Sequence, residues 1–142
     1  MKFTKIEISL CEQIAEKHRR NLKIGMYVWR KFCKSVQLIY RLDKEDKEIY
    51  TVILKGKKLN HLYWNNLKGG WLTPLWALSD CLEFLKGRNY DCILYSNRSQ
   101  LRWYLKFNIY PLVSSMEILN GGKTPLEVCL KAVLAVLEEE KA

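Results

Sequence analysis

Aromatic and basic side chains alternate along the segment Met26–Phe32, and this combination of residue types can bind nucleic acid. Tyr27, Trp29 and Lys31 occur at every second position, so a β-strand would place all three on one face. Aromatic rings can stack on bases, and ammonium groups can pair with phosphates. The alternative is that the rings face a core and the cations form a solvated face. The residues that we predict to bind nucleic acid are Tyr27, Trp29, Arg30, Lys31, Lys34, Arg41, Lys57, Lys58, Arg98 and Arg102.

Three carboxylates, those of Asp80, Glu83 and Asp91, form a second group that could do chemistry. Asp80 and Glu83 are three residues apart on a predicted helix, so they can share one side, and Asp91 begins the strand that follows. Clustered carboxylates hold the Mg²⁺ ions that metal-dependent nucleases use. The alternative is that Asp80 and Glu83 form the solvated side of the helix, opposite its leucines. We predict no catalytic residue and no metal ligand, and we keep a divergent nuclease as an alternative.

No cofactor is predicted, because no segment of the chain matches a nucleotide-binding motif. The glycine-containing segments 68–70 and 120–123 fit neither a P-loop nor a dinucleotide fingerprint. His18 and His61 are far apart and belong to no Ser/His/Asp or Cys/His pattern. The residue types and spacings therefore favour binding over catalysis.

The charge of the chain favours an anionic partner. The formal net charge is +9, and residues 1–34 hold nine Lys or Arg against three Glu. From Glu117 onward, five Glu oppose three Lys. A basic body with a mildly acidic tail points to nucleic acid as the partner. The alternative is that the charge only keeps the protein soluble.

Cysteine usage and hydropathy indicate a reduced, cytoplasmic protein. The five cysteines are odd in number and form no Cys-x-x-Cys pair, which argues against a disulfide framework and against a zinc site. No secretory signal peptide opens the chain, and no apolar run reaches about 18 residues. We therefore expect a cytoplasmic location and no membrane partner.

A mixed α/β pattern must position these residues, and we expect it to form a single domain over residues 1–142. Hydrophobic periodicity predicts an N-terminal helix at 4–22, which precedes an α/β core at 26–140. The core begins with an antiparallel β meander, and the weak turn near residues 33–35 leaves open whether it has three or four strands. The candidate strands are Met26–Phe32, Val36–Leu42, Glu48–Lys55 and Leu59–Trp64.

The rest of the core is predicted to be a helix–strand–helix unit and a C-terminal helix. Thr73 can cap a helix whose first turn contains Pro74, and a capping box at Thr124–Glu127 begins the last helix. Between these two helices we expect a buried strand at Asp91–Ser96, a short helix at Ser99–Phe107 and an ambiguous segment at Ile109–Val113 that could be a strand.

The segments Leu75–Leu85 and Tyr95–Leu101 resemble the first main helix and the following strand-to-helix junction of the ribonuclease-H-like superfamily. The order of predicted elements over 26–140 also resembles that layout, with the N-terminal helix as an addition. The resemblance implies two-metal phosphodiester hydrolysis by carboxylates from the first strand, the helix and the fourth strand. In this chain the first strand has no interior carboxylate, and Pro74 and Asn97 stand at the other two positions. The resemblance therefore implies a scaffold without a working nuclease centre.

The leading hypothesis is a non-catalytic module that binds nucleic acid, DNA or RNA, or that belongs to a nucleic-acid-handling complex. The alternative is a protein-interaction module, in which exposed Trp and Tyr side chains anchor a protein partner or a homodimer. The second alternative is a divergent metal-dependent nuclease that uses Asp80, Glu83 and Asp91. Resemblance of fold alone establishes none of the three.

Overall fold

The computed structural model describes residues 2–18, 20, 22–44, 50–56, 59–63, 72–109, 114–117 and 121–140. The chain divides into two units, one made of Met1–Phe3 and Arg19–Leu75, the other of Thr4–His18 and Trp76–Ala142. Each unit combines two separate segments of the chain, and each is described by itself. The mixed α/β class expected from the sequence is confirmed, whereas the single-domain organisation stays a prediction.

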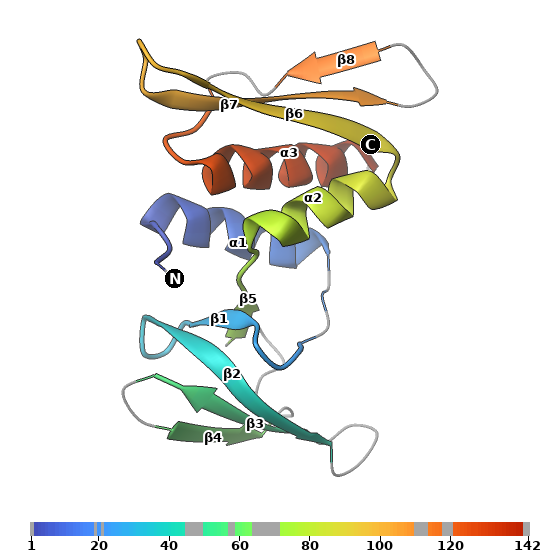
Figure 1. Cartoon of the computed structure of the whole chain (residues 1–142). Helices are drawn as coiled ribbons and strands as arrows, with labels where there is room; N and C mark the ends of the chain where they lie inside the picture. Colours follow the sequence, from blue (N-terminus) through green and yellow to red (C-terminus); the bar gives the residue numbers. More distant parts are fainter. Residues whose placement is uncertain are drawn as a thin grey trace. The chain divides into compact units, whose positions relative to one another are not determined.

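The first unit is built on an antiparallel sheet of five strands. The strands are β1 (Tyr27–Arg30), β2 (Ser35–Lys44), β3 (Tyr50–Lys55), β4 (Leu59–Tyr63) and β5 (Leu72–Pro74). Their order in the sheet is β4-β3-β2-β1-β5 (Figure 1). Strands β1 to β4 confirm the predicted meander and decide for four strands within it. One face of the sheet is a core in which Val28, Ile39, Val52 and Leu54 are fully buried.

Strand β5 corrects the prediction that Thr73 caps a helix. Thr73 and Pro74 pair with Trp29 and Val28 of β1, and the Leu75 amide donates to the Tyr27 carbonyl at 2.9 Å. Among the described residues β5 is an edge strand, where the missing N–H of a proline is tolerated. Pairing with a distant strand has therefore prevailed over the local preference for a helix start.

The second unit contains three helices and a three-stranded sheet. The elements are α1 (Lys5–Lys17), α2 (Leu78–Gly87), β6 (Tyr90–Asn97), β7 (Arg102–Ile109), β8 (Ser114–Glu117) and α3 (Pro125–Glu140). The sheet order is β6-β7-β8, with both pairs antiparallel. Helix α1 is shorter than the predicted 4–22, because the chain leaves the helix at His18. Residues 110–113 of the possible strand at Ile109–Val113 lie outside the described part of the chain.

Helix α3 lies at the centre of the second unit, with the sheet on one side and α1 on the other (Figure 1). Its residues from Leu126 to Leu137 are buried on almost every side of the helix; only Lys131 and Ala135 among them are half-buried. A helix that is apolar all round is typical of a core position. Half of the predicted capping box is confirmed, because the Glu127 amide donates to Thr124 Oγ1 at 3.0 Å, while the Glu127 carboxylate accepts from the Lys123 amide.

Strand β7 corrects the prediction of a helix at Ser99–Phe107. Residues 102–109 pair in full register with β6, and residues 98–101 form the connecting turn. The segment alternates, since Leu105 is buried and its neighbours Tyr104 and Lys106 are half-buried and exposed. This period of two is that of a strand, and packing of Leu105 on the helical side of the sheet fixes it.

The ribonuclease-H-like layout is not shown by the structure. That layout has a mixed sheet, whereas every strand pair among the described residues is antiparallel, and the strands form two separate sheets. Within the same described ranges, no helix combines the length and the apolar character needed to cross a membrane.

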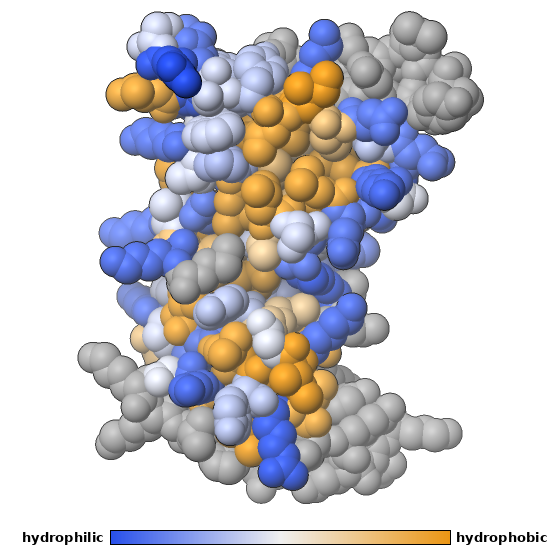
Figure 2. Space-filling model, viewed as in Figure 1, coloured by the Kyte–Doolittle hydropathy of each residue, from blue (hydrophilic) through white to orange (hydrophobic). Residues whose placement is uncertain are grey.

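Hydrophobic residues reach the surface of the second unit. Figure 2 shows them gathered over the part of that unit where α2, α3 and β6 lie, and hydrophilic residues around the β6–β7 turn. Ile93, Tyr95 and Leu101 are among the large hydrophobic side chains that are exposed in this unit. The exposed side of β6 and β7 is therefore the candidate binding surface of this unit.

Candidate nucleic-acid interface

Strands β6 and β7 have an inward and an outward face. Leu94 and Leu105 are cross-strand partners on the inward face, and Leu105 is fully buried there. Alternation places the neighbouring residues on the outward face. These outward residues are Asp91, Ile93, Tyr95 and Asn97 of β6 and Arg102, Tyr104 and Lys106 of β7. We call this set the outward β6–β7 face.

A stacked pair of tyrosines lies in the middle of the outward β6–β7 face. Tyr95 and Tyr104 are direct cross-strand partners, and their ring centroids are 5.7 Å apart with 20° between the ring planes. Tyr95 is 38% exposed and Tyr104 is half-buried. The Tyr104 hydroxyl donates to Gln100 Oε1 in the turn. This ring is therefore held by a hydrogen bond at its hydroxyl and by stacking on its face.

Cations lie at the turn end of this face and along β7. Arg98 is exposed in the turn, Arg102 stands opposite Asn97, and the exposed Lys106 stands opposite Ile93. The acidic residue Asp91 is exposed at the other end of β6, opposite Asn108. Glu117 of β8 is the register partner of Lys106. Positive charge is therefore concentrated toward the turn, where it can meet phosphate.

The β6–β7 turn is fixed by Asn97. Its Oδ1 accepts hydrogen bonds from the Ser99 amide at 3.1 Å and from the Ser99 hydroxyl at 2.7 Å. This is an Asx-type turn, in which a side chain replaces a backbone acceptor. Asn97 therefore has a structural role here, and the Ser99 amide, which the sequence placed at a helix N-terminus, is already bonded.

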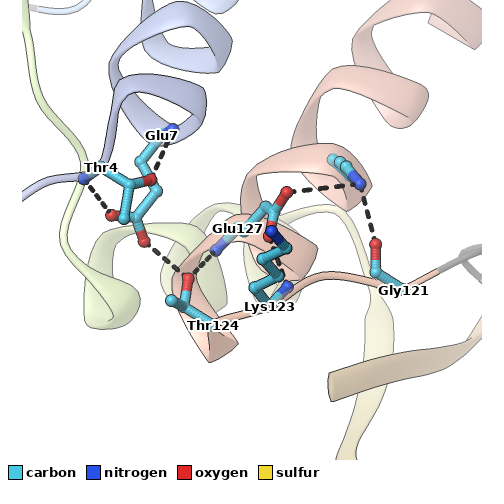
Figure 3. Close-up of polar contacts among 7 residues, drawn as sticks. Thr4, Glu7, Gly121, Lys123, Thr124 and Glu127 are labelled. Carbon is cyan, nitrogen blue, oxygen red and sulfur yellow. Dashed lines mark hydrogen bonds and ion pairs between the residues drawn. The ribbon is translucent and has the colours of Figure 1, made fainter. Parts of the chain in front are cut away.

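A network of polar groups joins the start of α1, the start of α3 and Gly121 inside the second unit (Figure 3). Glu7 accepts from the Thr4 amide through Oε1 and from the Thr124 hydroxyl through Oε2, both at 2.7 Å. Glu127 Oε2 accepts from the Lys123 amide. The starts of α1 and α3 are therefore tied to each other through the buried Glu7 carboxylate, while the buried Glu127 carboxylate bonds within the start of α3.

The network reaches the tyrosine through Gly121. Lys131 Nζ lies 3.7 Å from Glu127 Oε1 and donates to the Gly121 carbonyl at 2.8 Å. Gly122 pairs with Trp103 on the side of β7 that β6 does not occupy. A Cβ on Gly121 would stand 3.0 Å from the Tyr104 ring, and the φ of Gly121 is +55°. Only glycine fits this position without strain.

The predicted residues of the first unit lie in three places. Tyr27 and Trp29 share the face opposite Val28, as predicted, but both are half-buried, and the Tyr27 ring packs against Phe3 at 5.9 Å. Lys31 and Lys34 are exposed in the β1–β2 turn, because β1 ends at Arg30.

Of the remaining predictions for the first unit, Arg41 shares the sheet face of Tyr27 and Trp29, and Arg30 lies on the opposite face. Arg30 lies on the Val28 face and is the partner of Leu72, while Arg41 is exposed opposite Ile53. Lys57 and Lys58 lie outside the described residues. The described predictions of the first unit therefore do not lie on a single face, whereas Arg102 belongs to the outward β6–β7 face of the second unit and Arg98 lies in the adjoining turn.

Sequence reasoning missed Ile93, Tyr95, Tyr104 and Lys106 as members of a surface. The cause was the expected helix at Ser99–Phe107, which put Tyr104 and Leu105 on one side. The alternation of polar and apolar residues from Arg102 to Phe107 was the signal that could have revealed the strand.

The carboxylates considered for metal binding do not form a centre. Asp80 Oδ2 accepts from the Ala77 amide at 2.7 Å and so caps α2, Glu83 is exposed on α2, and Asp91 is on the outward face of β6. Within the described ranges, no group of three or more His, Cys, Asp and Glu side chains could hold a metal ion.

The thiols inside the second unit are shifted toward the neutral form. Burial, followed by the nearby Cys92, raises the pKa of Cys129 from 9.0 to about 12. The pKa of Cys92 is also raised, first by burial and then by Asp91. All five cysteines are free thiols, and Cys33 is exposed. A buried thiol with a raised pKa is a poor nucleophile at neutral pH.

Comparison with protein-family models, with curated proteins and with solved structures finds no match to this chain.

Proposed function

We propose that this protein binds nucleic acid through the outward β6–β7 face and does not cleave it. The observation that carries this proposal is the stacked Tyr95–Tyr104 pair, in which Tyr95 is exposed and Tyr104 half-buried, with cations bordering both rings. Stacking on aromatic rings and ion pairing with phosphates are the two interactions that bind nucleic acid without reading its sequence.

The charge of the protein supports an anionic ligand. The formal net charge is +9, which attracts polyanions over a distance of about one Debye length, roughly 10 Å at 0.1 M salt. On the outward β6–β7 face itself, Arg102 and Lys106 stand on either side of Tyr104 along β7. A bound backbone can therefore pair with cations while a base contacts the rings.

Binding without cleavage agrees with the position of the carboxylates. Asp80 caps a helix, and Asp91 is the one acidic member of the outward β6–β7 face. The ribonuclease-H-like resemblance of Leu75–Leu85 and Tyr95–Leu101 stays a prediction, and binding by this face does not depend on it.

Fluorescence anisotropy with labelled DNA and RNA tests the proposal. We expect affinity to fall steeply between about 50 and 200 mM salt, and Lys106→Gln to weaken binding. The matched control is Lys55→Gln, which removes an exposed lysine from β3 of the first unit and lowers the net charge equally.

Absence of binding at the lowest salt, or equal effects of the two lysine variants, would contradict binding by this face. Light scattering on the same samples tests the alternative that the protein is a protein-interaction module that forms a homodimer. A dimer that Ile93→Ala abolishes, in a protein that retains no nucleic acid, would assign the face to protein contact instead, because Ile93 is 58% exposed there.

A further inference from the structure

We infer that the nucleic acid bound by the outward β6–β7 face is single-stranded, with unpaired bases. This inference rests on the proposed function and specifies the ligand of the same site. It follows from what the tyrosine rings can contact and from the order of side chains along the two strands.

The faces of the bases are accessible to a protein in a single strand but not in a duplex. In a duplex each base is stacked on both sides by its neighbours, so its face is not available to a protein ring. In a single strand the bases can unstack and splay out onto aromatic side chains. Tyr95, on the edge strand of the described sheet, is 38% exposed and already carries one stacked ring, that of Tyr104.

The two tyrosine rings are also preorganised, because their stacked arrangement exists before a ligand binds. Tyr104 has Tyr95 on one side and Gly121 on the other, and its hydroxyl is bonded to Gln100. Ordering a side chain on binding costs free energy, so rings that are already held lower this cost. A base that stacks on Tyr95 would extend an existing column rather than create one.

The cross-strand rows define a short path for the chain of nucleotides. From the turn the outward pairs are Asn97–Arg102, Tyr95–Tyr104, Ile93–Lys106 and Asp91–Asn108. Consecutive rows are about 7 Å apart, since alternate residues of a strand share a face. Cations lie in the first and third rows, rings in the second, and the carboxylate of Asp91 in the fourth repels phosphate. Arg102 and Lys106 are the two cations of these rows, so the site holds a few nucleotides and pairs with about two phosphates.

Duplex binding would use the same hairpin differently. A two-stranded ribbon can enter the major groove, and Arg98 at the exposed turn would then make the main contacts. In that mode the tyrosine rings contribute little, whereas Arg98 contributes strongly. The effects of changing Tyr95 and Arg98 therefore distinguish the two ligands.

The experiment compares three polyanions in anisotropy titrations. They are a labelled DNA single strand, the duplex of the same sequence, and heparin, which contains no DNA. We expect Tyr95→Ala to weaken single-strand binding by about tenfold and to leave duplex and heparin binding within about twofold. The control is Tyr40→Ala, which removes an exposed tyrosine from the first unit. Tyr95→Phe keeps the ring and should keep the affinity, and retained duplex and heparin binding by Tyr95→Ala excludes misfolding as the cause of a loss.

Salt dependence gives an independent check on the path. Two phosphate contacts to a single strand predict a slope of about −1.4 in log affinity against log salt. Equal affinity for duplex and single strand, with binding sensitive to Arg98→Gln and not to Tyr95→Ala, would overturn the single-strand inference and leave the proposed function standing. Binding of none of the three polyanions would overturn both.

Discussion

Glu7 is the residue that joins two helix starts in the second unit. Its side chain is 3% exposed and accepts hydrogen bonds from Thr4 at the start of α1 and from Thr124 at the start of α3. Loss of one partner leaves the other buried and unsatisfied, which costs more than the hydrogen bond itself. A single carboxylate thus couples the N-termini of two helices that are far apart in sequence.

We expect Glu7→Ala to lower the free energy of unfolding by about 2–3 kcal/mol, because charge-assisted hydrogen bonds to a buried carboxylate are lost. Urea denaturation followed by circular dichroism measures the change. Glu16→Ala is the matched control, since Glu16 is exposed on the same helix. Equal destabilisation by the two variants would show that the network does not stabilise the fold.

Gly121→Ala should reduce both stability and nucleic-acid binding. The left-handed φ of +55° costs a non-glycine residue about 1–2 kcal/mol. The new methyl group would also clash with the Trp103 carbonyl oxygen and stand 3.0 Å from the Tyr104 ring. Gly87→Ala is the control, because a Cβ there meets nothing within 4 Å. Thermal melting and anisotropy together check the prediction, and unchanged binding in a folded Gly121→Ala protein would separate Gly121 from the site.

The buried thiol of Cys129 makes stability depend on alkaline pH. Its pKa is raised to about 12 in the folded protein from 9.0, so the folded state keeps its proton where the unfolded state loses it. This stabilising contribution is complete below pH 9 and is lost as pH rises toward 12. We expect the free energy of unfolding to fall across that interval, and its slope against pH to be smaller in Cys129→Ala. The exposed Cys33 provides the control, and an unchanged slope in Cys129→Ala would contradict the assignment.

Among the elements, β7 decides which residues share a face. A helix at Ser99–Phe107 would place Leu101 and Leu105 on the same side, whereas the strand buries Leu105 and leaves Leu101 83% exposed in the turn. We expect Leu105→Ala to cost about 2–5 kcal/mol and Leu101→Ala less than about 0.5 kcal/mol. Chemical denaturation of the two variants checks this, and similar costs would favour the helix.

The elements that were predicted correctly are those specified by nearby residues. The meander from β1 to β4 follows from alternation and turns, and the start of α3 follows from the local Thr124–Glu127 box. The start of α2 was wrong because Thr73 and Pro74 pair with β1, some 45 residues away in the sequence. Such pairing depends on tertiary contacts that local propensity does not contain.

The candidate interface could be predicted only in part for the same reason. Arg98 and Arg102 were named from their charge, but the tyrosine pair exists only because β6 and β7 align in one register. A one-residue shift would send Tyr104 inward and Leu105 outward. The sequence therefore indicated two cations at or beside this face but not the tyrosine pair at its centre.

At the scale of the whole molecule, the position of a charge should affect the affinity for nucleic acid more than the net charge does. Asp91→Asn removes a carboxylate from the outward β6–β7 face, and Glu83→Gln removes an exposed one from α2. Both raise the net charge by one, but salt screens distant charges. We expect Asp91→Asn to tighten binding of a single strand by about twofold at 0.1 M salt and Glu83→Gln to change it less. Equal effects in anisotropy titrations would mean that only the overall charge acts.

The contact between Glu7 and Thr124 joins residues that are 117 positions apart. The whole five-stranded sheet lies between them in sequence, so the ribosome synthesises α1 early and α3 late. Contacts that close so long a loop form slowly, and domains generally fold as their chain emerges. The first unit can therefore complete its sheet during synthesis, while α1, although made before it, must wait for α3 before it has a partner to pack against.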